Sequence, residues 1–194
     1  MFDESSADVT GHILEAFGEL NINLKNSSIV QKAVKYLRSE QTKNGTWQGR
    51  WGVNYIYGTS AAVIGLTSVG VPIADPLIVR ATHWLLECHN DDGGYGESFY
   101  SYTNEAYQCH GKSTPTQTAW ALMGLIAVGQ GTSQIAHQAA MYLVNIYEQE
   151  GDWIDHSFVG TGHPRIVPMN YPSYSRSFTM MALSRYLAGA TQHQ

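Results

Sequence analysis

The sequence predicts an all-α protein, an α/α toroid that forms part of a barrel of the (α/α)6 type from alternating outer and inner helices. Two observations support this fold class. One frame of spaced residues occurs three times, and segments rich in small residues separate the copies. Charged residues are interspersed at helical spacing in the frames but nearly absent from two of the separating segments. Stacked helix pairs of this kind bury each other's apolar faces.

The repeated frame combines a helix with a turn. It starts with a polar residue and Ala, continues with an aromatic residue and Leu, and ends with Gly, any residue and an aromatic ring. A Gly that follows an apolar helical pattern is typical of a left-handed helix end. The copies occupy residues 32–47, 80–95 and 138–153, within a single domain that we expect to extend over residues 1–194.

The frames predict three outer helices. Their apolar residues recur at helical spacing with polar and charged residues between them, which is the pattern of a helix with one buried face. The expected ranges are Ile29–Glu40, Pro76–His89 and Ser133–Gln149.

The intervening segments predict four inner helices, at Asp8–Leu20, Thr59–Val69, Thr114–Val128 and Tyr174–Leu187. They are rich in Ala, Gly, Thr and Ser, as expected of helices packed on most sides. Seven helices do not obviously close a ring. We therefore expect an open arc whose ends are completed by another chain, by a missing segment or by self-association.

Four residues of the frames are expected to hold consecutive repeats together. A Gln side chain offers both a donor and an acceptor to backbone groups at a helix end, and the Trp can lie back over the turn. We expect Gln41→Ala and Trp47→Ala to destabilise the fold without touching a binding site. The four structural residues are Gln41, Trp47, Tyr95 and Trp153.

Composition limits the classes of function. The net charge is −5 and Lys and Arg are scattered, which argues against nucleic acid as a partner. No run approaches the roughly 20 apolar residues that a membrane-spanning helix needs. Cys88 and Cys109 are far apart, and no secretory leader is recognisable, so we expect reduced thiols in a cytosolic compartment.

Several motifs resemble those of the triterpene cyclases. The frames are similar to the QW repeats of that family. Residues 49–59, Gly-Arg-Trp-Gly-Val-Asn-Tyr-Ile-Tyr-Gly-Thr, and residues 113–122 resemble two segments of its squalene-hopene cyclase branch. The similarity extends from Asp8 to Tyr186 and implies the C-terminal part of such a cyclase.

The resemblance implies an isomerase or lyase chemistry without a metal or other cofactor. In this family an acid protonates a C30 polyprene, squalene or its epoxide, and the cation then propagates through ring closures in a dry cavity lined by π faces. The acid is the middle Asp of an Asp-x-Asp-Asp motif. That motif is absent here, the nearest approach being Asn90-Asp91-Asp92. We therefore expect the chain to be non-catalytic alone and to need an upstream cyclase segment.

The resemblance also assigns roles to individual residues. His12 matches the family residue that hydrogen-bonds the acid, and a protonated imidazole there would lower the pKa of that carboxyl group. From the residues alone, His12 reads as a satisfied polar side chain of an inner helix. Trp51, Tyr55 and Tyr57 are expected in a Gly-bounded loop. The expected substrate contacts are Trp51, Tyr57, Tyr171 and Tyr174, and the expected core aromatics are Tyr55, Trp84, Trp120 and Tyr142.

One departure and two alternatives stay open at this point. Residues 163–168, His-Pro-Arg-Ile-Val-Pro, replace cavity Phe residues of the family, which implies weaker stabilisation of a late cation. Protein prenyltransferase β subunits share the toroid but bind zinc, for which the scattered His and the adjacent Cys88 and His89 are poorly placed. A non-catalytic lipid-binding protein, or a relic or split cyclase, is the other alternative.

A polyprene substrate suggests peripheral contact with a membrane or lipid droplet inside the cell, or a cytosolic location for a fragment.

Overall fold

A computed structural model describes residues 4–163 and 166–191. These residues confirm the all-α prediction. The helices are α1 (Ala7–Glu19), α2 (Ser28–Glu40), α3 (Tyr55–Ser68), α4 (Pro76–Glu87), α5 (Pro115–Ala127), α6 (Gln134–Glu150) and α7 (Pro172–Thr191), with short 3-10 helices η1 (Phe99–Tyr102) and η2 (Glu105–Tyr107). Strands β1 (Gly160–Thr161) and β2 (Pro168–Met169), which the sequence did not predict, pair antiparallel.

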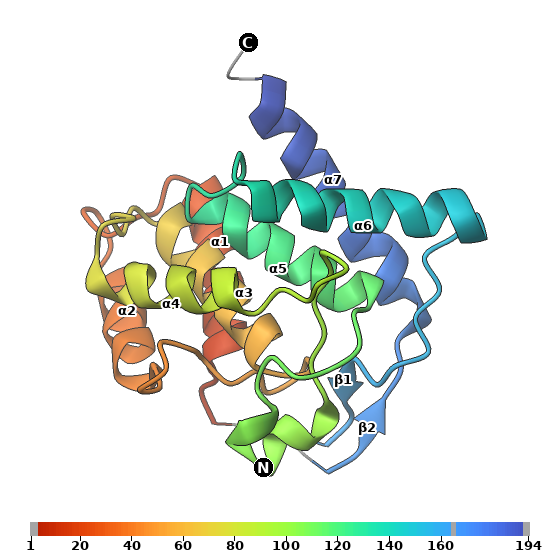
Figure 1. Cartoon of the computed structure of the whole chain (residues 1–194). Helices are drawn as coiled ribbons and strands as arrows, with labels where there is room; N and C mark the ends of the chain where they lie inside the picture. The colour runs from red at the N-terminus through yellow and green to blue at the C-terminus, as the bar shows by residue number, and fades with distance from the viewer. Residues whose placement is uncertain (1–3, 164–165, 192–194) are drawn as a thin grey trace.

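The helices form two layers (Figure 1). The inner layer is the row α1, α3, α5 and α7, in which each helix packs against the next. The outer layer consists of α2, α4 and α6: α2 packs on α1, α4 on α3 and α5, and α6 on α5 and α7. Outer and inner helices therefore alternate along the chain, as the repeat pattern predicts for a toroid.

Small residues let the first two inner helices touch through their backbones. A Cβ atom added at Gly65 of α3 would lie 2.2 Å from the carbonyl oxygen of Gly11 of α1. A Cβ atom at Gly11 would likewise lie 2.3 Å from the carbonyl oxygen of Ala61. Any larger residue would push the helices apart. This close approach brings His12 of α1 beside the first turns of α3.

The outer helices begin and end where their local sequence predicts. Ser27, Asp75 and Ser133 precede them, and each side-chain oxygen accepts a backbone N–H bond from the first turn. The frame glycines Gly45, Gly93 and Gly151 have φ angles of 83°, 82° and 71°. The three glycines thus share a left-handed conformation, but only Gly151 caps its helix directly; Gly45 and Gly93 lie in separate turns beyond the ends of α2 and α4.

Helix α3 begins earlier than predicted. It starts at Tyr55, so Tyr55 and Tyr57 lie in its first turn and the prediction of a loop there is wrong. The cause is a distant side chain, because the Glu97 carboxylate accepts hydrogen bonds from the backbone N–H groups of Asn54 and Ile56. A helix start that is satisfied from another segment leaves no local sequence signal.

Each frame aromatic donates a hydrogen bond back to the helix of its own repeat. The donor group lies ten residues after the accepting carbonyl in all three frames. The bonds are Trp47 Nε1 to Leu37 O (2.7 Å), Tyr95 Oη to Leu85 O (2.9 Å) and Trp153 Nε1 to Leu143 O (2.7 Å).

Gln41 connects the first repeat to the second. Its Nε2 donates to the carbonyl oxygen of Leu77 in α4 at 2.8 Å, and to that of Gly45 in its own turn at 3.0 Å. Arg80 of α4 donates in turn to the Gln41 Oε1 atom. The side chain thus bridges one turn and the next outer helix.

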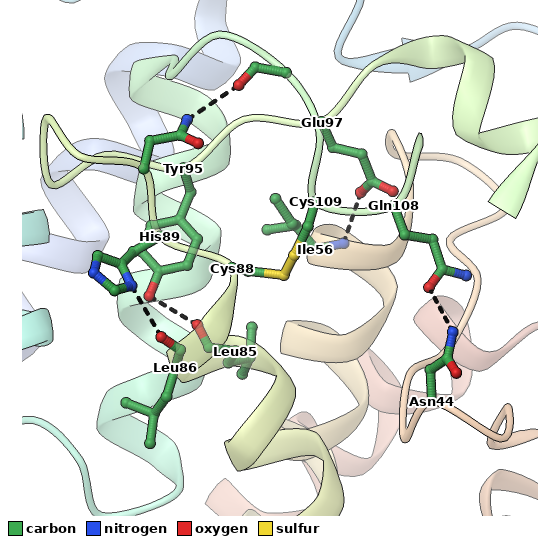
Figure 2. Close-up of a disulfide and its surroundings, with 12 residues drawn as sticks. Asn44, Ile56, Leu85, Leu86, Cys88, His89, Tyr95, Glu97, Gln108 and Cys109 are labelled. Carbon is green, nitrogen blue, oxygen red and sulfur yellow. Dashed lines mark hydrogen bonds between the residues drawn. A yellow bond between two sulfur atoms is a disulfide. The ribbon is translucent and has the colours of Figure 1, made fainter. Parts of the chain in front are cut away.

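The expectation of reduced thiols is wrong for this structure. Cys88 and Cys109 form a disulfide, with their Cα atoms 5.2 Å apart (Figure 2). The residues are separated by 21 positions in sequence, but η1 and η2 fold the intervening loop back to the end of α4. Spacing in the sequence gave no indication of this return.

Candidate functional site

A pocket of about 380 Å³ lies between α1, α3, α5 and α7. One part of its wall is polar and comes mainly from the two end helices of the inner row, α1 and α7, together with the Tyr57 hydroxyl of α3. The other part is aromatic and aliphatic and comes from α3, α5 and α7. The lining residues are His12, Glu15, Tyr57, Ser60, Ala61, Ile64, Trp120, Met123, Tyr174, Phe178, Met181 and Arg185.

The polar part is a chain of contacts from α3 through α1 to α7. The His12 Nε2 atom lies 3.0 Å from the Tyr57 hydroxyl oxygen. The His12 Nδ1 atom lies 3.9 Å from a carboxylate oxygen of Glu15, one turn further along α1. Arg185 of α7 donates to the other Glu15 oxygen at 2.6 Å. The first and last inner helices are therefore joined across the pocket.

The charges of this chain follow from its partners. Contact with His12, and the guanidinium of Arg185, lower the pKa of Glu15 despite its partial burial. Burial raises the pKa of Tyr57, so that its phenol stays protonated at neutral pH. The His12 side chain keeps 43% of its surface exposed, which leaves room for a further polar partner.

The aromatic wall is a connected cluster of rings. Trp120 of α5 lies at its centre, with ring centroids 4.7 Å from Tyr57 and 5.5 Å from Phe178. Tyr174 contacts Phe178 at 5.1 Å and stacks on Tyr171 at 4.8 Å. Such rings attract a cation without forming a bond to it.

The predicted site residues are only partly brought together. His12, Tyr57 and Tyr174 line the pocket. Tyr171 reaches it indirectly, by stacking on Tyr174. Trp51 is 39% exposed and lies in a different depression, against the outward side chains of α1. The structure therefore does not place Trp51 with the other predicted cavity residues.

Sequence reasoning missed half of the aromatic residues that line the pocket and half of the polar chain. Trp120 was assigned to the core; it is buried there and also lines the pocket. Phe178 follows Tyr174 by one helical turn, a spacing that could have indicated a shared face. Glu15 and Arg185 lie 170 positions apart, and no local pattern joins them.

The other predicted core aromatics behave as expected. Tyr55 is buried, and Trp84 and Tyr142 are partly buried against the core. Of residues 163–168, Pro164 and Arg165 lie outside the described residues. His163 and Ile166 are exposed and do not line the pocket.

The described residues offer little to a metal ion. Among residues 4–163 and 166–191, no three His, Cys, Asp or Glu side chains gather as a metal site would need. Cys88 and Cys109 are joined in the disulfide and so present no thiolate ligand. Within the same ranges, no helix combines the length and the apolar character needed to cross a bilayer.

The fold and the aromatic pocket agree with the class that the repeat frames resemble, the triterpene cyclases. Residues 1–188 match the model of the squalene-hopene cyclase C-terminal domain, and the chain belongs to this family.

Similar proteins are cyclases of several organisms. A squalene-hopene cyclase of Alicyclobacillus acidocaldarius is 44% identical over 95% of this chain. A squalene-tetrahymanol cyclase of Tetrahymena thermophila is 41% identical, and a dammaradiene synthase of the fern Dryopteris crassirhizoma 36% identical, each over 96% of the chain. The matched regions are 29%, 29% and 30% of these relatives, so the chain spans less than a third of their length.

Solved structures show the same fold at low sequence identity. The ent-copalyl diphosphate synthase from Streptomyces platensis has a TM-score of 0.71 at 19% identity, over 96% of this chain and 34% of the synthase. A possible member of the GH105 family from Salmonella enterica has a TM-score of 0.67 at 16% identity, over 96% of this chain and 57% of that protein. The two proteins are named for different families, so the toroid alone does not determine function.

Proposed function

We propose that this chain forms the C-terminal part of a triterpene cyclase of the squalene-hopene type, and that the pocket between α1, α3, α5 and α7 contacts the polyprene. The observation that carries the proposal is the pairing of His12 with an aromatic cluster in one pocket. Tyr57 belongs to both, because its hydroxyl contacts His12 and its ring contacts Trp120.

The pocket residues suit a travelling cation. The π faces of Trp120, Tyr57 and Phe178 stabilise a positive charge without forming a covalent bond to the cation. Glu15 supplies a carboxylate that could trap a cation, but its charge is balanced by Arg185. The aliphatic side chains of Ile64 and Met123 exclude water from the same space.

His12 has the position of a residue that acts on an acid held by another segment. Its ring is oriented by Tyr57 on one nitrogen and faces Glu15 with the other. A protonated His12 beside a carboxyl group favours the carboxylate form and so makes that carboxyl group a stronger acid. The 194 residues contain no Asp-x-Asp-Asp motif. The partner that completes the site is therefore a segment carrying this motif.

The proposed substrate is a C30 polyprene such as squalene. The relatives that match along 95–96% of the chain include cyclases named for squalene. A hydrocarbon of this size is held in lipid, so the complete enzyme works at a membrane or lipid-droplet surface.

A chimera tests this proposal. Residues 1–194 replace the matching 29% of the Alicyclobacillus squalene-hopene cyclase, and products from squalene are measured by gas chromatography and mass spectrometry. We expect cyclic products from the chimera, and a loss of at least about a hundredfold in rate on His12→Ala, which is typical for removal of one catalytic interaction. Trp51→Phe, outside the pocket, serves as the matched control. A folded chimera whose rate is unaffected by His12→Ala would contradict the role of His12.

A non-catalytic lipid-binding protein is the second candidate. The absence of the acid motif from the 194 residues favours it. Squalene binding can be followed through tryptophan fluorescence, with Trp120→Phe identifying the signal from the pocket. Binding without any turnover in the chimera would favour this candidate over the cyclase.

The prenyltransferase alternative requires zinc. The disulfide removes Cys88 from the set of ligands, and the described residues hold no suitable cluster. A stoichiometric zinc content in the purified protein would support the prenyltransferase alternative.

A further inference from the structure

Residues 96–111, here called the tether loop, lead from the turn of the second frame to α5. The base of the loop is closed by contact between its two arms. A Cβ atom at Gly96 would lie 2.0 Å from the carbonyl oxygen of Lys112. The backbone N–H of Ser98 donates to the carbonyl oxygen of His110 at 3.0 Å. The loop is therefore a discrete unit that contains η1 and η2.

One arm of the tether loop is bound to the outer layer. Cys109 is bonded to Cys88, the C-terminal cap of α4. The neighbouring Gln108 accepts a hydrogen bond from Asn44, in the turn of the first frame, at 3.3 Å (Figure 2). Cys109 also has a φ of 61°, a left-handed conformation that is unfavourable outside glycine. The disulfide is the covalent restraint at this position.

The other arm holds the start of α3. The Glu97 carboxylate accepts a hydrogen bond from the backbone N–H group of Ile56 at 2.9 Å (Figure 2). It also accepts one from the backbone N–H group of Asn54 at 3.3 Å. The Tyr102 hydroxyl donates to the carbonyl oxygen of Gly52 at 2.7 Å. The Asn54 side chain gives α3 no cap of its own. The first N–H groups of α3 thus depend on the tether loop.

The rest of the tether loop has little to keep it ordered. No residue of η2 is buried, and residues 103–107 are all exposed. Segments with few buried apolar contacts open locally at low cost. Without the disulfide, the arm that carries Cys109 would keep its hydrogen bonds and the partial packing of Cys109 against the core, but no covalent link to α4.

We propose that the Cys88–Cys109 disulfide is a redox-sensitive clamp that keeps the N-terminus of α3 ordered through the tether loop. A thiolate of a dithiol reductant attacks one sulfur of the disulfide and forms a mixed disulfide with the protein. The second thiolate of the reductant then attacks the reductant's sulfur in that mixed disulfide and releases the protein thiol. Two electrons and two protons convert the disulfide into two thiols, and the reductant leaves as its own disulfide. Cys109 is the more accessible target, because Cys88 is only 3% exposed and Cys109 is partly exposed.

Reduction of the disulfide would also change the pocket, because Tyr57 lies in the first turn of α3. Loss of the Glu97 hydrogen bonds frees that turn, and with it the contact between Tyr57 and His12. This proposal concerns the order of α3 and holds whether or not the pocket belongs to a cyclase.

Hydrogen exchange measured by mass spectrometry tests the clamp in the intact chain, with and without dithiothreitol. We expect exchange to rise at least about tenfold in the tether loop and at residues 53–57, with no change in α2. The melting temperature should fall by about 5–10 °C, and reoxidation should restore both values. Complete reduction by thiol titration with unchanged exchange at residues 53–57 would overturn the proposal, as would two free thiols in air-oxidised protein.

A double variant separates the disulfide from other effects of the reductant. Cys88→Ser with Cys109→Ser should exchange as reduced wild type does, and it should not respond to dithiothreitol. A further rise in its exchange at residues 53–57 on adding reductant would contradict the assignment. If the variant does not fold, reduced wild type alkylated with iodoacetamide provides the same comparison.

Discussion

The aromatic residues of the repeat turns and those of the pocket have the same chemistry in different surroundings. Trp47 and Tyr95 are fully buried, and each donates its polar hydrogen to a carbonyl ten residues upstream. Trp120 is equally buried, but within the described residues its Nε1 has no hydrogen-bond partner. Its neighbours are other rings. The turn aromatics thus hold the backbone in place, whereas Trp120 packs its ring against the other aromatic residues of the pocket wall.

Two carboxyl groups, Glu97 and Glu15, show the same contrast between residues that support the fold and residues of the pocket. Burial raises the pKa of Glu97, beneath the start of α3, to about 7, although two backbone N–H groups act against the rise. In the pocket, contact with His12 and Arg185 lowers the pKa of Glu15. The supporting carboxyl group is therefore buried with a raised pKa, whereas the pocket carboxyl group has a lowered pKa and an arginine partner. The predictions below test this division.

The largest effect is expected from removing a turn aromatic. Trp47→Ala should lower the free energy of unfolding by about 3–5 kcal/mol, because it leaves a cavity and an unsatisfied Leu37 carbonyl. Urea denaturation measures this loss. Trp51→Ala, at an exposed ring, is the control and should cost less than about 1 kcal/mol. Equal losses in the two variants would contradict a structural role for the frame.

Glu97 should make stability depend on pH. Its folded pKa of about 7 lies above the unfolded value, so its contribution to stability is complete below about pH 4.5 and is lost as pH rises to about 7. The change amounts to roughly 3 kcal/mol. In Glu97→Gln this part of the pH dependence should be absent from unfolding curves between pH 4.5 and 7. An unaltered pH profile in the variant would show that Glu97 is not the group responsible.

A matched pair of Trp→Phe substitutions probes the two kinds of aromatic directly. Trp47→Phe loses a hydrogen bond to buried backbone and should cost about 1–2 kcal/mol beyond the change in volume. Trp120→Phe breaks no hydrogen bond within the described residues and should cost clearly less, while weakening squalene binding. Thermal unfolding compares the two. A larger loss of stability in Trp120→Phe than in Trp47→Phe would contradict the distinction between structural and pocket aromatics.

The smallest effect is expected at Gln41. Gln41→Ala removes the donor to the Leu77 and Gly45 carbonyls and should cost about 1 kcal/mol, the usual net contribution of a hydrogen bond to stability. Calorimetry should show a fall in melting temperature of about 2–4 °C with no change in squalene binding. A change in binding with unaltered stability would place Gln41 in the pocket instead.

The sequence predicted the structural features that are determined by residues close together in the chain. The outer helices, their caps and the frame turns follow from local spacing, and the structure differs at their ends by only a few residues. The start of α3 was missed because Glu97 caps it from 41 positions away. The disulfide was missed because its loop returns through two short 3-10 helices.

The residues that line the candidate pocket could be anticipated only in part, for the same reason. The resemblance to the cyclases singled out His12, Tyr57 and Tyr174, which the structure brings into one pocket. In sequence, Trp120 has the same appearance as a core residue, and only its ring contacts distinguish it. The ion pair of Glu15 with Arg185 depends on how the inner row curves, which no single segment encodes.

The central claim is that this chain supplies the pocket of a cyclase while the acid comes from another segment. The most direct measurement is the conversion of squalene by residues 1–194 alone, side by side with the Alicyclobacillus chimera, under identical detergent and substrate conditions. We predict cyclic products from the chimera and none above background from the chain alone. Cyclic product from the chain alone would contradict the claim, because the proton would then have to come from a group within these 194 residues.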